Sequence, residues 1–236
     1  MKKNLLCAIV LLTAGPLFAA DSTPNDDVKS AADKLAAADS YAWKTTVEAK
    51  QFRPGPSTGQ TEKDGYTYLT FSMRDNTTEA VIKGGKAIIK TDDGWQTLQE
   101  ASKDNGDGQF NPIRFLAFRL RNYKNPAEEA ANLAGKTKEL TKSDDVYSGD
   151  MTEDGAKSLL SFRRPGGGDG PAVSNAKGTV KFWIKDGALT KYQFKLEGTV
   201  NFNGNDRDID RTTTVEINGV GSTKVSVPEE AKKKLS

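Results

Sequence analysis

Twelve residues near the C-terminus alternate without interruption between apolar and polar side chains. In 191–202 the side chains assigned to one face are Tyr192, Phe194, Leu196, Gly198, Val200 and Phe202. This alternation indicates a β-strand with one buried face, about twice the usual five or six residues long. The turn sequence Asn203-Gly204-Asn205-Asp206 follows, and 208–217 alternates again, with Ile209 and Arg211 on its inner side. The sequence therefore predicts a long antiparallel sheet with one apolar face.

The first half of the chain predicts a helix followed by an antiparallel meander. A helix is expected over 26–39, because small apolar residues recur at helical spacing; they are Val28, Ala31, Ala32 and Leu35. Such a narrow stripe lets a helix lie close to a sheet. From Ser40 the period changes to two, and further strands are expected at 66–73, 77–83 and 86–91, with a turn at 92–94 leading into 95–98. Another strand, 179–185, precedes the long one.

The middle of the chain predicts a helical insertion over about 111–162. A helix over 113–121 carries apolar residues on most of its surface, with only Arg114, Arg119 and Arg121 expected to face water. A second helix should begin at Asn125-Pro126, and a third should cover 152–162. A flexible loop is expected over about 163–178, which contains Arg163 to Gly170 with four glycines and a proline. A short tail helix is expected from Glu229.

These elements predict a mainly β (α+β) fold. Each exposed Phe, Leu or Ile on the sheet would forgo about 1.5–3 kcal/mol of burial, so the apolar face must be covered. The short helices are the available cover. We therefore expect a curved antiparallel half-barrel sheet with short helices packed in its concave face, and residues 21–236 as a single domain.

The N-terminus predicts a cleaved export signal over residues 1–20. Lys2 and Lys3 precede an apolar run over 5–12, and Ala19-Ala20 supplies a small pair for cleavage. A membrane anchor is the alternative, but the run is shorter than the roughly 20 residues that span a bilayer. No second segment reaches that length, so we expect a periplasmic or secreted protein without a membrane span.

The composition argues against an enzyme. The chain has no histidine, and its one cysteine, Cys7, lies inside the predicted signal. Histidine general bases, Ser–His or Cys–His nucleophiles, and metal sites built on imidazole or thiolate are therefore excluded from the mature chain. Losing the signal would remove two lysines from 34 basic residues and leave 32, equal to the 32 acidic residues. This balance argues against nucleic-acid binding. No cofactor is expected.

Two acidic clusters resemble functional motifs and are better explained otherwise. The segment 104–108 is similar to part of a calcium loop, but that alignment would put Lys103 and Arg114 at ligand positions. Asp206, Asp208 and Asp210 are predicted to lie on a solvated strand face beside basic neighbours. An acid–base enzyme would need inward-facing carboxylates, and none of the predicted inward positions is acidic. No metal site is predicted.

The order of these features resembles the bacterial periplasmic lipoprotein-carrier superfamily, which includes Lol-type carriers and LppX-like half-barrels. The similarity lies in the export signal, the small-residue helix leading into Tyr41-Ala42-Trp43, the helical insertion, and the hairpin from Phe182 to Phe202. The segment Val225 to Ala231 also looks like the end of such chains. The resemblance covers nearly all of the mature length and implies an eleven-stranded half-barrel that carries acyl chains. The chain lacks the lipid-attachment cysteine of the LppX-like members.

The aromatic residues of the predicted inner face are the candidate ligand-binding residues. They are Trp43, Phe71, Phe115, Leu116, Phe118, Phe182, Tyr192, Phe194 and Phe202. Helix 113–121 could act as a movable plug over them. The first hypothesis is therefore binding or carriage of a hydrophobic ligand or of lipoprotein acyl chains. The alternative is a non-enzymatic envelope interaction or sensing module with a filled core and an envelope protein partner. An apolar hollow of about several hundred cubic ångströms between helix 113–121 and the sheet would favour carriage.

Overall fold

The structure is a computed structural model that describes residues 22–50, 55–73, 76–103, 111–161, 170–202 and 204–236. The predicted export signal, the acidic segment 104–108 and most of the glycine-rich segment 163–170 lie outside the described residues. No helix among the described residues is both long and apolar enough to cross a bilayer.

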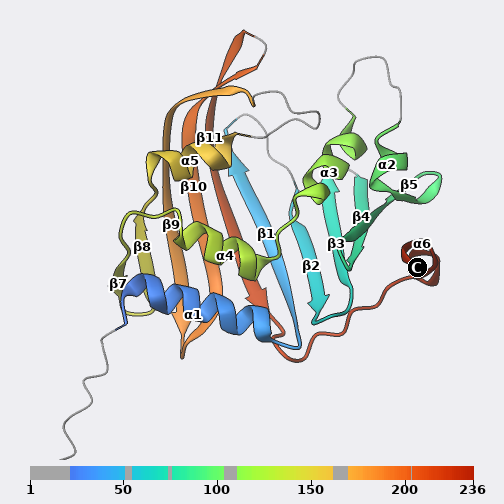
Figure 1. Cartoon of the computed structure of the whole chain (residues 1–236), viewed down its shortest axis with the longest axis horizontal. Coiled ribbons are helices and arrows are strands. Elements are labelled where there is room, and N and C mark those ends of the chain that lie inside the picture. The colour runs from blue at the N-terminus through green and yellow to red at the C-terminus, as the bar shows by residue number, and fades with distance from the viewer. Residues whose placement is uncertain (1–21, 51–54, 74–75, 104–110, 162–169, 203) are drawn as a thin grey trace, which may run out of the picture.

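One antiparallel sheet of eleven strands forms the body of the molecule (Figure 1). Its spatial order is β6-β5-β4-β3-β2-β1-β11-β10-β9-β8-β7, so the first and last strands of the chain pair at the centre. The strands are β1 (Ser40–Ala49), β2 (Ser57–Glu62), β3 (Thr67–Met73), β4 (Asn76–Lys83), β5 (Lys86–Thr91), β6 (Gly94–Thr97), β7 (Thr141–Ser143), β8 (Val146–Asp150), β9 (Ala172–Lys185), β10 (Ala188–Phe202) and β11 (Asn205–Asn218). The predicted open half-barrel is confirmed.

The tight turns use residues that tolerate positive φ. Gly84 and Gly85, with φ of 55° and 77°, connect β4 to β5, and Asp186 and Gly187 do the same for β9 and β10. Both hairpins were expected from the sequence. Turns of this kind follow the natural twist of the strands, so they fix the register in which the long strands pair.

Six helices accompany the sheet among the described residues. They are α1 (Pro24–Ala37), α2 (Leu98–Ala101), α3 (Pro112–Arg121), α4 (Pro126–Ala134), α5 (Glu153–Leu160) and α6 (Glu229–Leu235). The first five begin at a side-chain cap, and Thr23, Thr97 and Asn125 each form a capping box. The caps explain why such short segments begin where they do.

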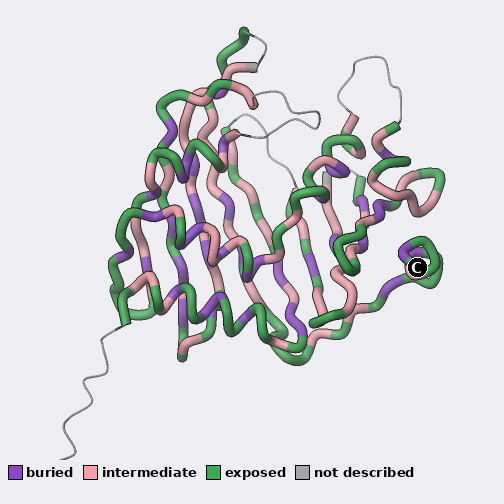
Figure 2. The backbone as a smooth tube through the Cα atoms, viewed as in Figure 1, coloured by how far each residue is buried: buried purple, intermediate pink, exposed green. Residues whose placement is uncertain are grey.

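Five helices cover the concave face in two groups. On one side α1 lies on β9 and β10, α4 packs on α1, and α5 lies on β9 and β10; on the other side α2 and α3 lie against β5 (Figure 1). Figure 2 shows buried positions recurring along the strands and on the helices above them. The predicted stripe of α1 is fully buried; its residues are Val28, Ala31, Ala32 and Leu35. These small residues let α1 approach the sheet closely.

The tail covers part of the opposite, convex face. Ala231 and Leu235 of α6 form a separate apolar cluster with Val81 of β4 and Ile88 of β5. The next residues in those strands, Ala80 and Ile89, belong to the main core on the concave side. Strands β4 and β5 are therefore buried on both faces, which explains their uninterrupted apolar runs.

Several predicted boundaries were wrong, each for a physical reason. Residues 57–62 form β2 although its sequence, STGQTE, has no apolar alternation. The predicted helical insertion contains the short strands β7 and β8, which extend the sheet beside β9. Strand β9 begins at Ala172, so 172–178 is not a loop, because pairing with β10 continues through this segment although its sequence does not alternate regularly. Neighbouring strands supply the order that the local sequence does not.

Candidate binding site on the concave face

The predicted site residues form two groups that differ in burial. Trp43, Leu116, Phe182, Tyr192 and Phe194 are buried, and Phe182 and Tyr192 are completely inaccessible. In the second group, Phe71 and Phe118 are partly buried, whereas Phe115 is 46% exposed. Phe202 ends β10, and its side chain lies outside the described part of the chain.

The strand residues of the first group lie on one apolar face, called the floor here; they are Trp43, Phe182, Tyr192 and Phe194. Tyr192 of β10 pairs with Phe182 of β9 and with Val215 of β11, and the Phe182 and Tyr192 ring centroids are 6.4 Å apart. Trp43 lies opposite Gly59 of β2, and its ring centroid is 5.5 Å from that of Tyr41. Because these rings are enclosed by protein, they form a filled core in this conformation.

Two members of the second group, Phe115 and Phe118, lie on α3, and Phe71 lies on β3. The buried side of α3 consists of Leu116, Ala117 and Leu120. Phe115 is 46% exposed, so the expectation that only the arginines of this helix face water was wrong. The backbone of α3 packs against α2 and β5, and the backbone of α4 packs against α1. Space for a ligand beneath α3 would therefore require its displacement from β5.

A carboxylate, Glu129 of α4, lies against the floor. The Tyr192 hydroxyl donates a hydrogen bond of 2.5 Å to Glu129 Oε2. Burial raises the pKa of Glu129, although the hydrogen bond from Tyr192 and the positive charges of Arg119 and Arg211 oppose the rise. The inference that no inward position is acidic therefore fails for the helical cover. One signal was present in the sequence, since position 129 falls on the stripe formed by Pro126, Ala130 and Leu133.

Two arginines from different elements flank this carboxylate. Arg211 of β11 is half-buried on the concave face, as its position in the alternation predicted. Arg119 of α3 keeps contact with water, yet the surrounding protein lowers its pKa. Burial and the charge of Arg119 lower the pKa of Arg211, and Glu129 opposes both shifts. Within the described residues, neither guanidinium forms an ion pair.

Three buried polar atoms near this cluster have no hydrogen-bond partner among the described residues. They are the Tyr41 hydroxyl, the Tyr123 hydroxyl and Arg211 Nε. Burial raises the pKa of Tyr41 to about 12 and that of Tyr123 well above its usual value. Buried donors without partners are rare, and each costs about 1–3 kcal/mol. The hydrogen-bonding capacity of this polar cluster is therefore only partly used among the described residues.

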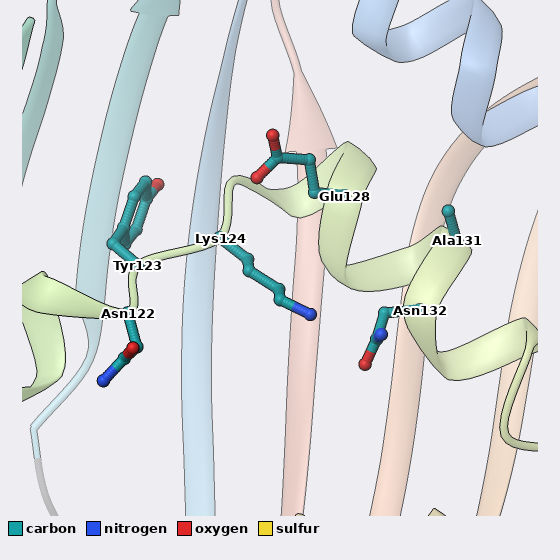
Figure 3. Close-up of a pocket in the computed structure, with 6 residues that line it drawn as sticks. All are labelled: Asn122, Tyr123, Lys124, Glu128, Ala131 and Asn132. Atoms are coloured by element: carbon teal, nitrogen blue, oxygen red, sulfur yellow. The ribbon is translucent and has the colours of Figure 1, made fainter. Parts of the chain in front are cut away.

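An open pocket of about 620 Å³ adjoins the link between α3 and α4. Figure 3 shows its lining side chains, which come from the link and from α4; they are Asn122, Tyr123, Lys124, Glu128, Ala131 and Asn132. No strand residue lines it. The pocket is therefore not the predicted hollow between helix 113–121 and the sheet, and it does not decide between carriage and a filled core.

The acidic cluster on β11 is a charged outer surface, as predicted. Asp210 forms an ion pair of 2.7 Å with Lys50 and a longer one with Lys195. Asp208 accepts a hydrogen bond from Thr199. The described residues contain no group of three or more side chains placed to hold a metal ion.

An open half-barrel with helices in its concave face is the class of structure that the sequence resemblance predicted. Two solved structures are similar to this chain. LprF from Mycobacterium bovis shares 10% identity, with a TM-score of 0.44, over 88% of this chain and 97% of that one. A LolA superfamily protein from Nitrosomonas europaea shares 9% identity, with a TM-score of 0.34, over 87% of this chain and 96% of that one. No protein-family model and no curated protein sequence matches the chain.

Proposed function

We propose that this chain is an exported, non-enzymatic protein that binds a hydrophobic ligand, such as an acyl chain, between its sheet and its helical cover. The main support is the contrast between the buried aromatic floor and the partly exposed aromatics at the α3 end. Phe115 is 46% exposed, and Phe71 and Phe118 are only partly buried. Apolar side chains left partly uncovered at the rim of an apolar floor suit the entry of a hydrocarbon chain.

Displacement of α3 would open the site. Its buried residues, Leu116, Ala117 and Leu120, face the protein interior at the β5 end of the sheet in the closed state. Exposing each large apolar side chain costs about 1.5–3 kcal/mol, so the empty protein remains closed. An acyl chain that replaces these contacts offsets the cost, and the ligand thereby stabilises the open state. The exported location rests on the predicted signal over 1–20, and lipoprotein acyl chains are one suitable source of ligand.

The second candidate is an envelope interaction or sensing module with a permanently filled core. The complete burial of Phe182 and Tyr192 favours it, because rings enclosed on all sides leave no room for a ligand. In that case the partner would be a protein of the cell envelope, contacting the outer face or a sheet edge.

Fluorescent fatty-acid binding tests the proposal. We expect the mature protein to bind the probe and Phe115→Gln to bind it about 5- to 10-fold more weakly, since about 1 kcal/mol of apolar contact is lost. Val220→Gln is the matched control, because Val220 is also exposed, at 52%, but follows β11 and is not part of α3. Lipid extraction of protein purified from the periplasm should recover acyl species. A protein that contains no lipid and ignores the probe would support the filled-core module instead.

A further inference from the structure

We infer that the concave site selects amphiphiles with an anionic head group, carboxylate or phosphate, which Arg119 and Arg211 bind while the hydrocarbon lies on the apolar floor. This inference rests on the proposed function and names its class of ligand. It is carried by the position of Arg211 among apolar neighbours of the sheet and by two buried donors without an acceptor among the described residues, Arg211 Nε and the Tyr123 hydroxyl.

Arg211 occupies an unfavourable position for a cation. It pairs across the sheet with Ala49 of β1 and Leu196 of β10, and Leu196 is completely buried. Ile209 and Thr213 precede and follow it on the same face of β11. A cation among such neighbours loses hydration and needs an anionic partner in return. The sheet itself supplies none.

The available negative charge near the arginines is insufficient. Glu129 is the acidic residue that acts on both Arg119 and Arg211, and its Oε2 already accepts the hydrogen bond from Tyr192. Lys124 adds a further positive charge around Glu129. Two guanidinium groups and one carboxylate leave the cluster with an excess positive charge, which attracts an anion.

The donors needed to hold an anion are also present. Arg211 Nε and the Tyr123 hydroxyl are buried and have no acceptor among the described residues. Guanidinium groups bind carboxylate and phosphate through paired hydrogen bonds, which makes arginine better suited than lysine to such a site. Because Arg119 is exposed to water, the head group can reach the cluster from solvent.

The alternative is that the two arginines only hold α4 in place through Glu129. The two roles differ in what substitution does. A holding role predicts that Arg211→Gln weakens the fold or the binding of every amphiphile alike. A head-group role predicts a selective loss of anionic ligands, with uncharged ligands of the same chain length retained.

Binding measurements with three ligands of equal chain length test the inference: hexadecanoate, hexadecyl phosphate and uncharged hexadecanol. We expect the natural protein to prefer one or both anions over hexadecanol by about tenfold or more, equivalent to about 1.4 kcal/mol. Arg211→Gln and Arg119→Gln should remove most of that preference and still bind hexadecanol. Arg211→Lys should restore part of it. Arg114→Gln, on the exposed side of α3, is the matched control and should retain the full preference.

Comparing the three ligands separates the possible outcomes of this experiment. Preference for only one anion identifies the head group, and competition by inorganic phosphate alone would place the phosphate source in solution rather than on a lipid. Equal binding of all three ligands by the natural protein, or equal loss of all three in both Gln variants, would overturn the inference and leave hydrophobic carriage standing. Failure of every amphiphile to bind would instead overturn the proposed function.

Discussion

Gly59 illustrates how a single residue sets the spacing of the floor. A side chain at this position of β2 would overlap the ring of Trp43, which lies across the strand. We therefore expect Gly59→Ala to lower the free energy of unfolding by about 1–3 kcal/mol, the usual cost of overpacking. Urea denaturation measures this. Gly135→Ala is the control, since a Cβ there would make only ordinary contacts, and it should change stability by less than about 0.5 kcal/mol.

Glu129 gives a pH dependence of stability with a definite sign. Its pKa is raised in the folded protein above the usual 4.5, so the folded state binds the proton more tightly than the unfolded state. Its contribution to stability is therefore greatest below pH 4.5 and decreases as the pH rises through the folded pKa. Four groups from different parts of the fold face Glu129 and keep the same charge over this pH range; they are Arg119, Arg211, Lys124 and Tyr192.

The pH dependence can be isolated by comparing the natural protein with Glu129→Gln. The free energy of unfolding of the natural protein, measured relative to the variant, should fall as the pH rises above 4.5. Glu128→Gln, one residue away and exposed, is the control and should not reproduce this difference. A difference that instead grows with pH would mean that the neighbouring arginines, rather than burial, dominate the carboxylate.

At the scale of elements, the tail helix provides a test of the second core. Ala231 of α6 is fully buried against Val81 and Ile88 on the convex face. We expect Ala231→Asp to detach α6 and to cost about 2 kcal/mol or more, because a charge would be placed in an apolar contact. Guanidinium denaturation and binding of a hydrophobic dye report both effects. Lys233→Asp, on the exposed side of the same helix, should have little effect; equal effects would show that α6 does not depend on this contact.

Element by element, the sequence predicted those strands and helices whose own residues carry the pattern. The alternation of β10 and the small-residue stripe of α1 are examples, and both were confirmed. Strand β2 was missed because its residues are polar and its order comes from β1 and β3 on either side. The first seven residues of β9 were missed because their own sequence does not alternate regularly and their order comes from pairing with β10. Hydrogen bonds between neighbouring strands leave no pattern in the local amino-acid sequence.

The candidate site was predictable only in part. Alternation correctly placed Trp43, Phe182, Tyr192 and Phe194 on the inner face and Arg211 beside them. It could not indicate how deeply each ring would be enclosed, because burial depends on which helix lies above. The polar cluster depends on Glu129, whose partner Tyr192 is 63 residues away in the sequence. Contacts over such separations follow from topology and not from spacing.

For the whole molecule, the continuous main core on the concave side predicts cooperative unfolding. A single apolar cluster joins residues from α1 at one end of the chain to β11 at the other. We expect far-ultraviolet circular dichroism and the fluorescence of Trp43 to report one coincident transition, measured in a Trp95→Phe, Trp183→Phe background. Two separated transitions would show that the halves of the sheet on either side of the β1–β11 pair unfold independently.

The two outer edges of the sheet, β6 and β7, are consecutive strands of the chain. Residues 98–140 join them, and the described part of this connection contains α2, α3 and α4, which lie over the concave face between the two edges (Figure 1). Flattening the sheet would stretch the link at 122–125, and a longer link would let the two edges move further apart. Insertions or deletions at 122–125 should therefore tune how readily the molecule admits a guest.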